Sequence, residues 1–120
     1  MTAVANEHVQ RELLREAAEN GPAAIFVVGD DCRYVAVNDF ACRLLGYSRE
    51  ELLGLSPEDV SPDSPMAAGF KELVGNGVLV GESFVRTKTG RDIKVQYRAA
   101  EAKVAGLDFW VCVALPLDVV

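Results

Sequence analysis

The chain has 120 residues and a formal net charge of −6 at pH 7; half of its residues are hydrophobic and a quarter are charged. This length and composition predict one globular domain with a single core, and the acidic charge argues against nucleic acid or an anionic membrane as a partner. The apolar runs are too short for a membrane-spanning helix, and residues 1–19 lack the pattern of a signal peptide, so a cytoplasmic location is expected.

An amphipathic helix is predicted first, over residues 6–19. Its apolar side chains fall on one stripe, formed by Val9, Leu13, Leu14 and Ala17. The sequence NGP at residues 20–22 ends this helix. Two short strands follow, over residues 24–28 and 33–37, and the turn at residues 29–31 joins them as a hairpin.

Residues 38–54, with the sequence NDFACRLLGYSREELLG, encode two short helices. Asn38 can cap the first helix, and Gly46 can supply the left-handed residue that ends it. Ser48 opens the second helix, with Glu51 three residues later to complete a capping box. Because each cap stabilises a helix by about 1 kcal/mol, even helices of under two turns are expected to form.

Two Ser-Pro pairs, at residues 56–57 and 64–65, predict further helix starts with proline in the first turn. The first pair opens a short helix. The second opens a helix that continues through Met66, Phe70 and Leu73.

The last third of the chain changes to the alternating pattern of strands, over residues 80–88, 91–102 and 107–115. On the second strand one row is apolar and must face inward; it consists of Ile93, Val95, Tyr97 and Ala99. The order of elements predicts an α+β fold. We expect a five-stranded antiparallel sheet with short helices on one face and a flanking amphipathic helix at the N-terminus.

The helical block resembles the signature of the PAS domain family, the sensory and interaction modules of signalling proteins. The matching residues are Asn38, Ala41, Leu44, Leu45, Gly46, Tyr47, Ser48, Glu50, Glu51, Leu52 and Gly54. Glu82 matches a glutamate that the family carries at the start of a strand, whereas residues 88–90 read Lys-Thr-Gly in place of the usual Lys-Asp-Gly hairpin. The resemblance implies a flanking helix over residues 1–21, a PAS-like domain over residues 22–120, and a downstream signalling effector.

The resemblance also implies a pocket between the sheet and the short helices. The candidate lining residues are Ile25, Val27, Asn38, Leu44, Met66, Phe70, Leu73, Ser83, Val95 and Tyr97. Ser83 and Tyr97 would be the polar groups available to orient a ligand in this largely apolar interior. Two alternatives stay open at this point: a solid core, or a cavity that holds a small molecule.

The cofactors of the family can be compared with this chain. Haem-binding members commonly ligate iron through a histidine in the helix that corresponds to residues 65–75, and this chain has none there. Members that form a flavin adduct carry Asn-Cys-Arg-Phe-Leu-Gln, which residues 31–34 (DCRY) echo only in the wrong place, the first hairpin. Haem held by histidine and adduct-forming flavin are therefore not expected. A non-covalent small molecule or flavin is allowed, with Trp110 either as a stacking group or as a packing residue.

Catalysis is not expected, because the single histidine, His8, lies among polar neighbours in the N-terminal helix, where no nucleophile has an obvious base. No metal site is expected either. The three cysteines, Cys32, Cys42 and Cys112, fit neither a disulfide framework nor a zinc motif, so they should be reduced thiols. A thiol redox switch at Cys32 or Cys42 is the least favoured of the functions considered.

The outer face of the sheet suggests an interface. If Ser83 points inward, then Phe84 points outward, and Trp110 is expected there as well. Such exposed aromatic side chains need a cover, which the stripe of the N-terminal helix could provide across a homodimer. The preferred function is a cytoplasmic sensory module that binds a small molecule and signals through dimer rearrangement. The alternative is a ligand-free interaction and dimerisation module.

Overall fold

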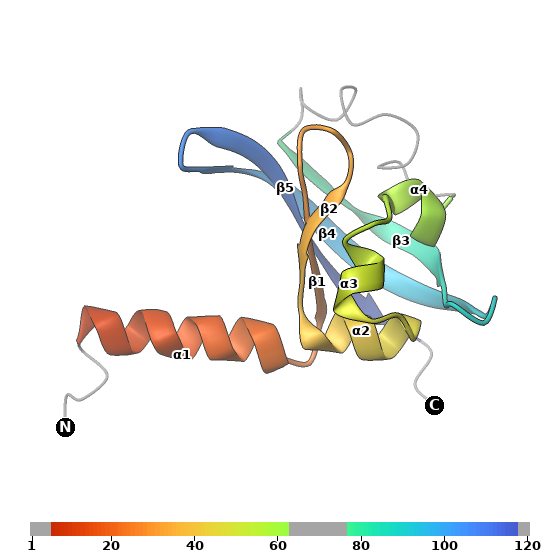
Figure 1. Cartoon of the computed structure of the whole chain (residues 1–120), viewed down its shortest axis with the longest axis horizontal. Coiled ribbons are helices and arrows are strands. Elements are labelled where there is room, and N and C mark those ends of the chain that lie inside the picture. The colour runs from red at the N-terminus through yellow and green to blue at the C-terminus, as the bar shows by residue number, and fades with distance from the viewer. Residues whose placement is uncertain (1–5, 63–76, 118–120) are drawn as a thin grey trace.

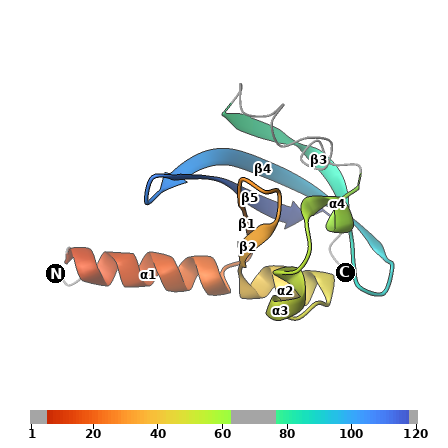
Figure 2. The ribbon, with the colours of Figure 1, turned by 45° about the horizontal axis from the view of Figure 1, so that its top comes forward.

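One antiparallel sheet organises the computed structural model, which describes residues 6–62 and 77–117. In chain order the elements are α1 (Glu7–Asn20), β1 (Ala24–Val28), β2 (Tyr34–Val37), α2 (Asp39–Leu45), α3 (Arg49–Leu52), α4 (Pro57–Val60), β3 (Val78–Arg86), β4 (Asp92–Val104) and β5 (Leu107–Pro116). The five strands lie in the order β2-β1-β5-β4-β3. Helices α2, α3 and α4 lie on one side of the sheet, whereas α1 projects away from it (Figures 1 and 2). The predicted α+β fold is confirmed; the helix predicted through Met66, Phe70 and Leu73 lies outside the described residues.

The helical caps form as the sequence predicts. Asn38 caps α2, and Gly46 ends it in the left-handed conformation with φ 78°. Ser48 Oγ accepts a hydrogen bond from Glu51 N at 3.1 Å, and Glu51 Oε1 accepts one from Ser48 N at 2.9 Å, which completes the capping box of α3. Local hydrogen bonds thus hold helices that are only seven and four residues long.

The inner face of the sheet carries the core. The row Ile93, Val95, Tyr97 and Ala99 of β4 is buried, as predicted. On β1 the inward residues are Ala24, Phe26 and Val28, so Ile25 and Val27 occupy the outer face, contrary to prediction. All five residues of β1 are apolar, and such a strand has no polar row to show which face is outside. Pairing with β5 decides it, because Phe26 lies opposite Cys112 while Ile25 lies opposite Val113.

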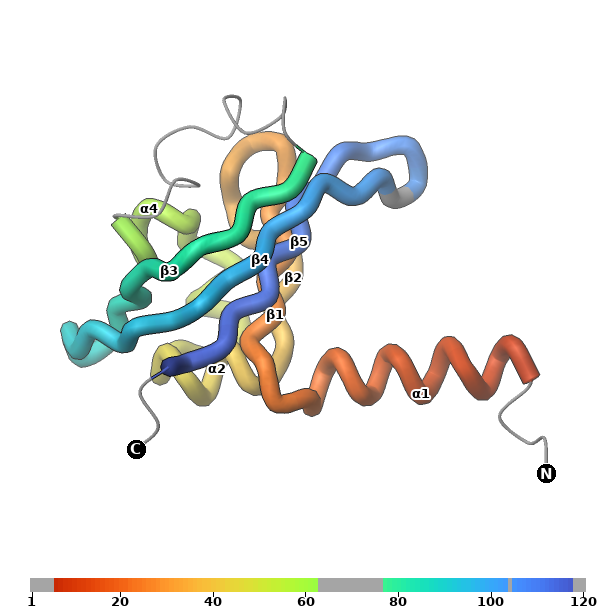
Figure 3. Tube along the Cα trace, turned by 180° about the vertical axis from the view of Figure 1, so that it is seen from behind, coloured from red at the N-terminus to blue at the C-terminus, as the bar shows by residue number. Residues whose placement is uncertain are grey.

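Helix α1 is fixed to the domain at its C-terminal end. Asn38 Nδ2 donates to Ala18 O at 2.7 Å, and Glu19 accepts from Asp39 N at 3.2 Å and pairs with Arg49 at 2.6 Å. No residue of α1 is buried. Its apolar stripe is therefore open within one chain, and Figure 3 shows that no described helix crosses the outer face of the sheet.

Candidate functional site

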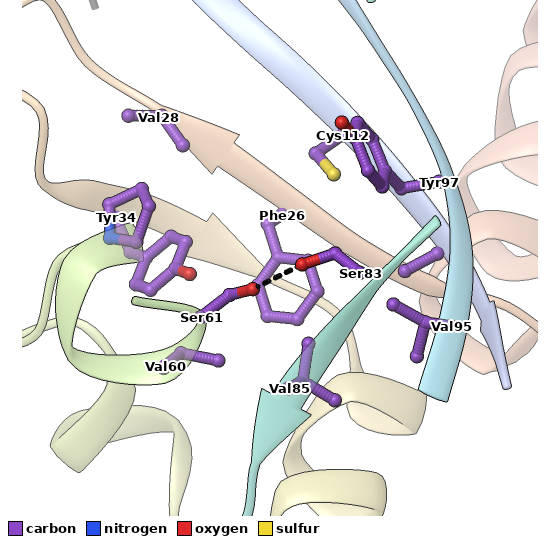
Figure 4. Close-up of a pocket in the computed structure, with 12 residues that line it drawn as sticks. Phe26, Val28, Tyr34, Val60, Ser61, Ser83, Val85, Val95, Tyr97 and Cys112 are labelled. Atoms are coloured by element: carbon purple, nitrogen blue, oxygen red, sulfur yellow. Dashed lines mark hydrogen bonds between the residues drawn. The ribbon is translucent and has the colours of Figure 1, made fainter. Parts of the chain in front are cut away.

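A small cavity of about 40 Å³ lies between the inner face of the sheet and α4 (Figure 4). Its lining consists of Phe26, Val28, Tyr34, Pro57, Val60, Ser61, Ser83, Val85, Val95, Tyr97, Cys112 and Ala114. The strands contribute alternate residues, as the pleat requires. The walls are mostly apolar, and none of these side chains carries a charge.

Ser61 holds the end of α4 against the edge strand β3. Its Oγ donates to Phe84 O at 2.5 Å and lies 2.9 Å from Ser83 Oγ. The Ser61 hydroxyl has one proton, and the Phe84 carbonyl can only accept, so that proton is committed to Phe84. Ser83 must therefore donate to Ser61 Oγ, which leaves the lone pairs of Ser83 free to accept a hydrogen bond in the cavity.

Two tyrosines bring further hydroxyls to the cavity, from opposite sides in Figure 4. Burial raises the pKa of both Tyr34 and Tyr97, so each hydroxyl keeps its proton at neutral pH. Within the described residues neither hydroxyl has a hydrogen-bond partner. Tyr97 lies across Gly81, where a Cβ atom would come within 3.1 Å of its Oη. The glycine thus makes room for the tyrosine.

Cys112 completes the wall beside Tyr97. Burial raises the pKa of this thiol to about 11, which keeps it protonated and poorly nucleophilic. Cys32 and Cys42 are half-buried free thiols outside the cavity.

The predicted lining residues divide into four groups. Ser83, Val95 and Tyr97 line the cavity. Ile25, Val27 and Asn38 instead border an open hollow next to the C-terminal part of α1, on the other side of the sheet. Leu44 borders a shallow hollow beside the β3–β4 hairpin, and Met66, Phe70 and Leu73 lie outside the described residues.

Sequence reasoning missed several lining residues, chiefly Phe26, Tyr34, Ser61 and Cys112. Phe26 could have been assigned to the inner face if β1 had been paired with β5 and not considered alone. Ser61 carries no signal in the sequence, because its partner Ser83 is 22 residues away and only the fold brings them together.

The predicted interface is partly wrong. Phe84 points outward with 48% of its surface exposed, as expected, but Trp110 is 1% exposed and packs in the core. Trp110 shares the inner face with Cys112 and Ala114. Both rows of β5 are apolar from Phe109 onward, and its pairing with β1 selects this row as the inner one. Because Trp110 is buried, the stripe of α1 in a partner chain cannot contact it.

The stripe of α1 is exposed, as an interface would require. Val9, Leu13 and Leu14 are exposed to 37%, 49% and 71%, and Ala17 is exposed as well. The outer face of the sheet adds further apolar residues in two groups. One is Val78, Val80 and Phe84 on β3; the other is Ile25, Val27, Val111, Val113 and Leu115 on β1 and β5. The outward residues Lys94, Gln96 and Arg98 of β4 lie between the two groups. We call the two apolar groups together the outer-face patch.

Metal and cofactor chemistry has little support in the described part of the chain. No three metal-ligating side chains gather there, and no helix among residues 6–62 and 77–117 is long and apolar enough to cross a bilayer. Pockets that hold drug-sized ligands measure about 300–1,000 Å³, and the space between the described lining residues, about 40 Å³, is much smaller than a flavin ring or haem requires. The lining also lacks a histidine to ligate haem iron.

Comparisons with known proteins agree on one family. A sequence model described as a PAS domain matches residues 12–80. No curated protein matches the chain.

Three solved structures are similar over nearly their whole length. A PAS domain from a two-component sensor histidine kinase shares 22% identity with a TM-score of 0.78, covering 92% of this chain and 99% of its own. The PAS domain of an HTR-like protein from Haloarcula marismortui shares 21% with a TM-score of 0.80, covering 92% and 93%. A domain of a sensory box sensor histidine kinase/response regulator from Geobacter sulfurreducens shares 25% with a TM-score of 0.76, covering 94% and 99%.

Proposed function

Because the chain belongs to the PAS domain family, which is typical of sensor histidine kinases and other signalling proteins, we propose that it is a cytoplasmic sensory module that binds a small molecule and passes the signal to a downstream effector. The observation that carries this proposal is the cavity under α4. It combines apolar walls with hydroxyl groups that have unused hydrogen-bonding capacity, which is the usual composition of a ligand site.

The proposed module has two parts, a flanking helix over residues 1–21 and a sensory domain over residues 22–120. We infer that two chains form a homodimer through the stripe of α1 and the outer-face patch, both of which carry exposed apolar side chains. A stable interface buries about 800 Å² on each partner. One helical stripe is small for that area, so the two surfaces would act together.

Signal transmission would run along β1. Phe26 and Val28 contact the cavity, and Asn38 bonds both to Ile25 N in the same strand and to Ala18 O at the end of α1. A ligand that binds two positions of β1 unequally therefore also biases the direction of α1. A change in the direction of α1 would then change the arrangement of the two chains in the dimer.

Sedimentation equilibrium of the full chain tests the dimer. Leu14→Glu and Phe84→Glu should each weaken self-association at least tenfold, because a charge would have to be desolvated in an apolar interface. Leu53→Glu, which changes a leucine of 40% exposure after α3, serves as the control. A monomeric parent chain, or dimers equally stable in all three variants, would refute this interface.

The alternative function is a ligand-free interaction module, which the small volume of the cavity favours. Native mass spectrometry of freshly purified protein, compared with the denatured mass, tests for a retained ligand. Two-dimensional NMR against a small-molecule library tests for weaker ones. If no compound shifts the amide signals of the cavity residues while the dimer persists, the interaction module is the correct reading.

A further inference from the structure

The size of the cavity limits its ligand first. A cavity needs roughly 10–15 Å³ to hold one water molecule, so about 40 Å³ holds about three atoms or groups of that size. A ligand that lies wholly inside this space therefore has about two to four non-hydrogen atoms.

The charge of the walls limits the ligand further. The twelve lining residues that belong to the described part of the chain are uncharged at neutral pH, and Cys112 and both tyrosines keep their protons. A carboxylate, ammonium or phosphate group would lose its hydration without gaining a counter-ion. The described walls therefore favour a neutral ligand.

The hydrogen-bonding pattern selects the functional group. Ser83 can only accept from a ligand, because its proton is committed to Ser61. Tyr34 and Tyr97 have protons to donate. A ligand hydroxyl can donate to Ser83 and accept from a tyrosine at the same time. A nitrile nitrogen or a ketone oxygen can only accept.

We propose that the cavity binds a small neutral hydroxyl compound, of the class of the short-chain alcohols, with its hydroxyl at Ser83 and its alkyl group against the apolar wall that includes Val85, Val95 and Ala114. This assignment rests on the proposed sensory function and names its ligand. The alcohol would be bound reversibly and without chemical change.

The alcohol is expected to bind weakly, so the assay must measure binding at equilibrium with the alcohol present. Since each non-hydrogen atom contributes at most about 1.5 kcal/mol, three or four such atoms give dissociation constants of about 40 µM to 0.5 mM at best. Such a ligand is lost on purification and must be added. Nitrogen-15 NMR titration of the full chain with methanol, ethanol, 1-propanol and 1-butanol measures it at equilibrium, with acetonitrile and propionate as probes that lack the donor or carry a charge.

Saturable shifts confined to cavity residues, with an affinity optimum at ethanol or 1-propanol, are the expected result. Ser83→Ala should weaken binding of that alcohol about 2- to 12-fold, the loss of one neutral hydrogen bond. Ala114→Val should abolish it by filling the cavity. Val35→Thr, which changes an exposed residue of β2 outside the cavity, should leave it unchanged; folded spectra of all variants verify the comparison.

Three outcomes would overturn the proposal. Equal binding of acetonitrile and ethanol, or unchanged affinity in Ser83→Ala, would remove the hydroxyl anchor. Tight binding of propionate or of a larger co-purified compound would refute the ligand class but leave the sensory module standing. No saturable shift with any alcohol, acetonitrile or propionate, together with an apo mass in native mass spectrometry, would refute both and leave a water-filled cavity in an interaction module.

Discussion

Asn38 joins three elements, and its replacement by alanine is the sharpest test of how the domain holds α1. The side chain is 5% exposed. Its Oδ1 accepts from Ile25 N at 2.9 Å and Ala41 N at 3.0 Å, and its Nδ2 donates to Ala18 O at 2.7 Å and Ala23 O at 2.8 Å. Truncation removes all four hydrogen bonds at once.

Each such hydrogen bond contributes about 1 kcal/mol net, so Asn38→Ala should lower the free energy of unfolding by about 3–5 kcal/mol. That is a large part of the roughly 5–15 kcal/mol that a domain of this size has. Asn38→Asp keeps the two accepted bonds but turns a carboxylate oxygen toward the carbonyls of Ala18 and Ala23, so it should lose at least half as much.

Urea denaturation followed by circular dichroism and by the fluorescence of the buried Trp110 measures these losses. Asn20→Ala, at the exposed end of α1, is the matched control and should stay within about 0.5 kcal/mol of the parent. Hydrogen exchange should also show α1 losing protection in Asn38→Ala. A loss below about 1 kcal/mol for Asn38→Ala would show that water replaces these bonds and that Asn38 does not couple α1 to the sheet.

Three other predictions concern single contacts. Gly81→Ala should destabilise the fold by about 1–2 kcal/mol because its Cβ would crowd Tyr97 Oη; the cost should disappear in a Tyr97→Phe background, and an equal cost there would contradict the contact. The salt bridge with Lys88 helps to lower the pKa of Glu51 to about 2, below its unfolded value of 4.5, so its stabilisation is present above pH 4.5 and lost as the pH falls toward 2. In Glu51→Gln the free energy of unfolding should fall less steeply between pH 4.5 and pH 2 than in the parent chain. An equally steep fall would refute the lowered pKa of Glu51. Iodoacetamide should alkylate Cys112 about 100-fold more slowly at pH 8 than a free thiol, since burial raises its pKa from 9.0 to about 11; peptide mapping by mass spectrometry measures the rate, and labelling at the rate of an unfolded control would show that the thiol is not buried.

The sequence predicted the features that depend on near neighbours in the chain. Asn38, Gly46 and the Ser48–Glu51 capping box act within a few residues, so their hydrogen bonds could be named from spacing alone. The row of β4 that contains Val95 and Tyr97 alternates with polar residues, so the sequence also predicted that this row faces the core.

Only the tertiary structure decided the features that depend on strand pairing. Both faces of β1, and of β5 from Phe109 onward, are apolar, so the sequence could not show that Phe26 and Trp110 point inward and Ile25 outward. The hydrogen bond between Ser61 and Ser83 likewise joins residues far apart in the chain. A side chain's face follows from local alternation when one row is polar; when both rows are apolar, burial favours either face equally and the neighbouring strand selects one.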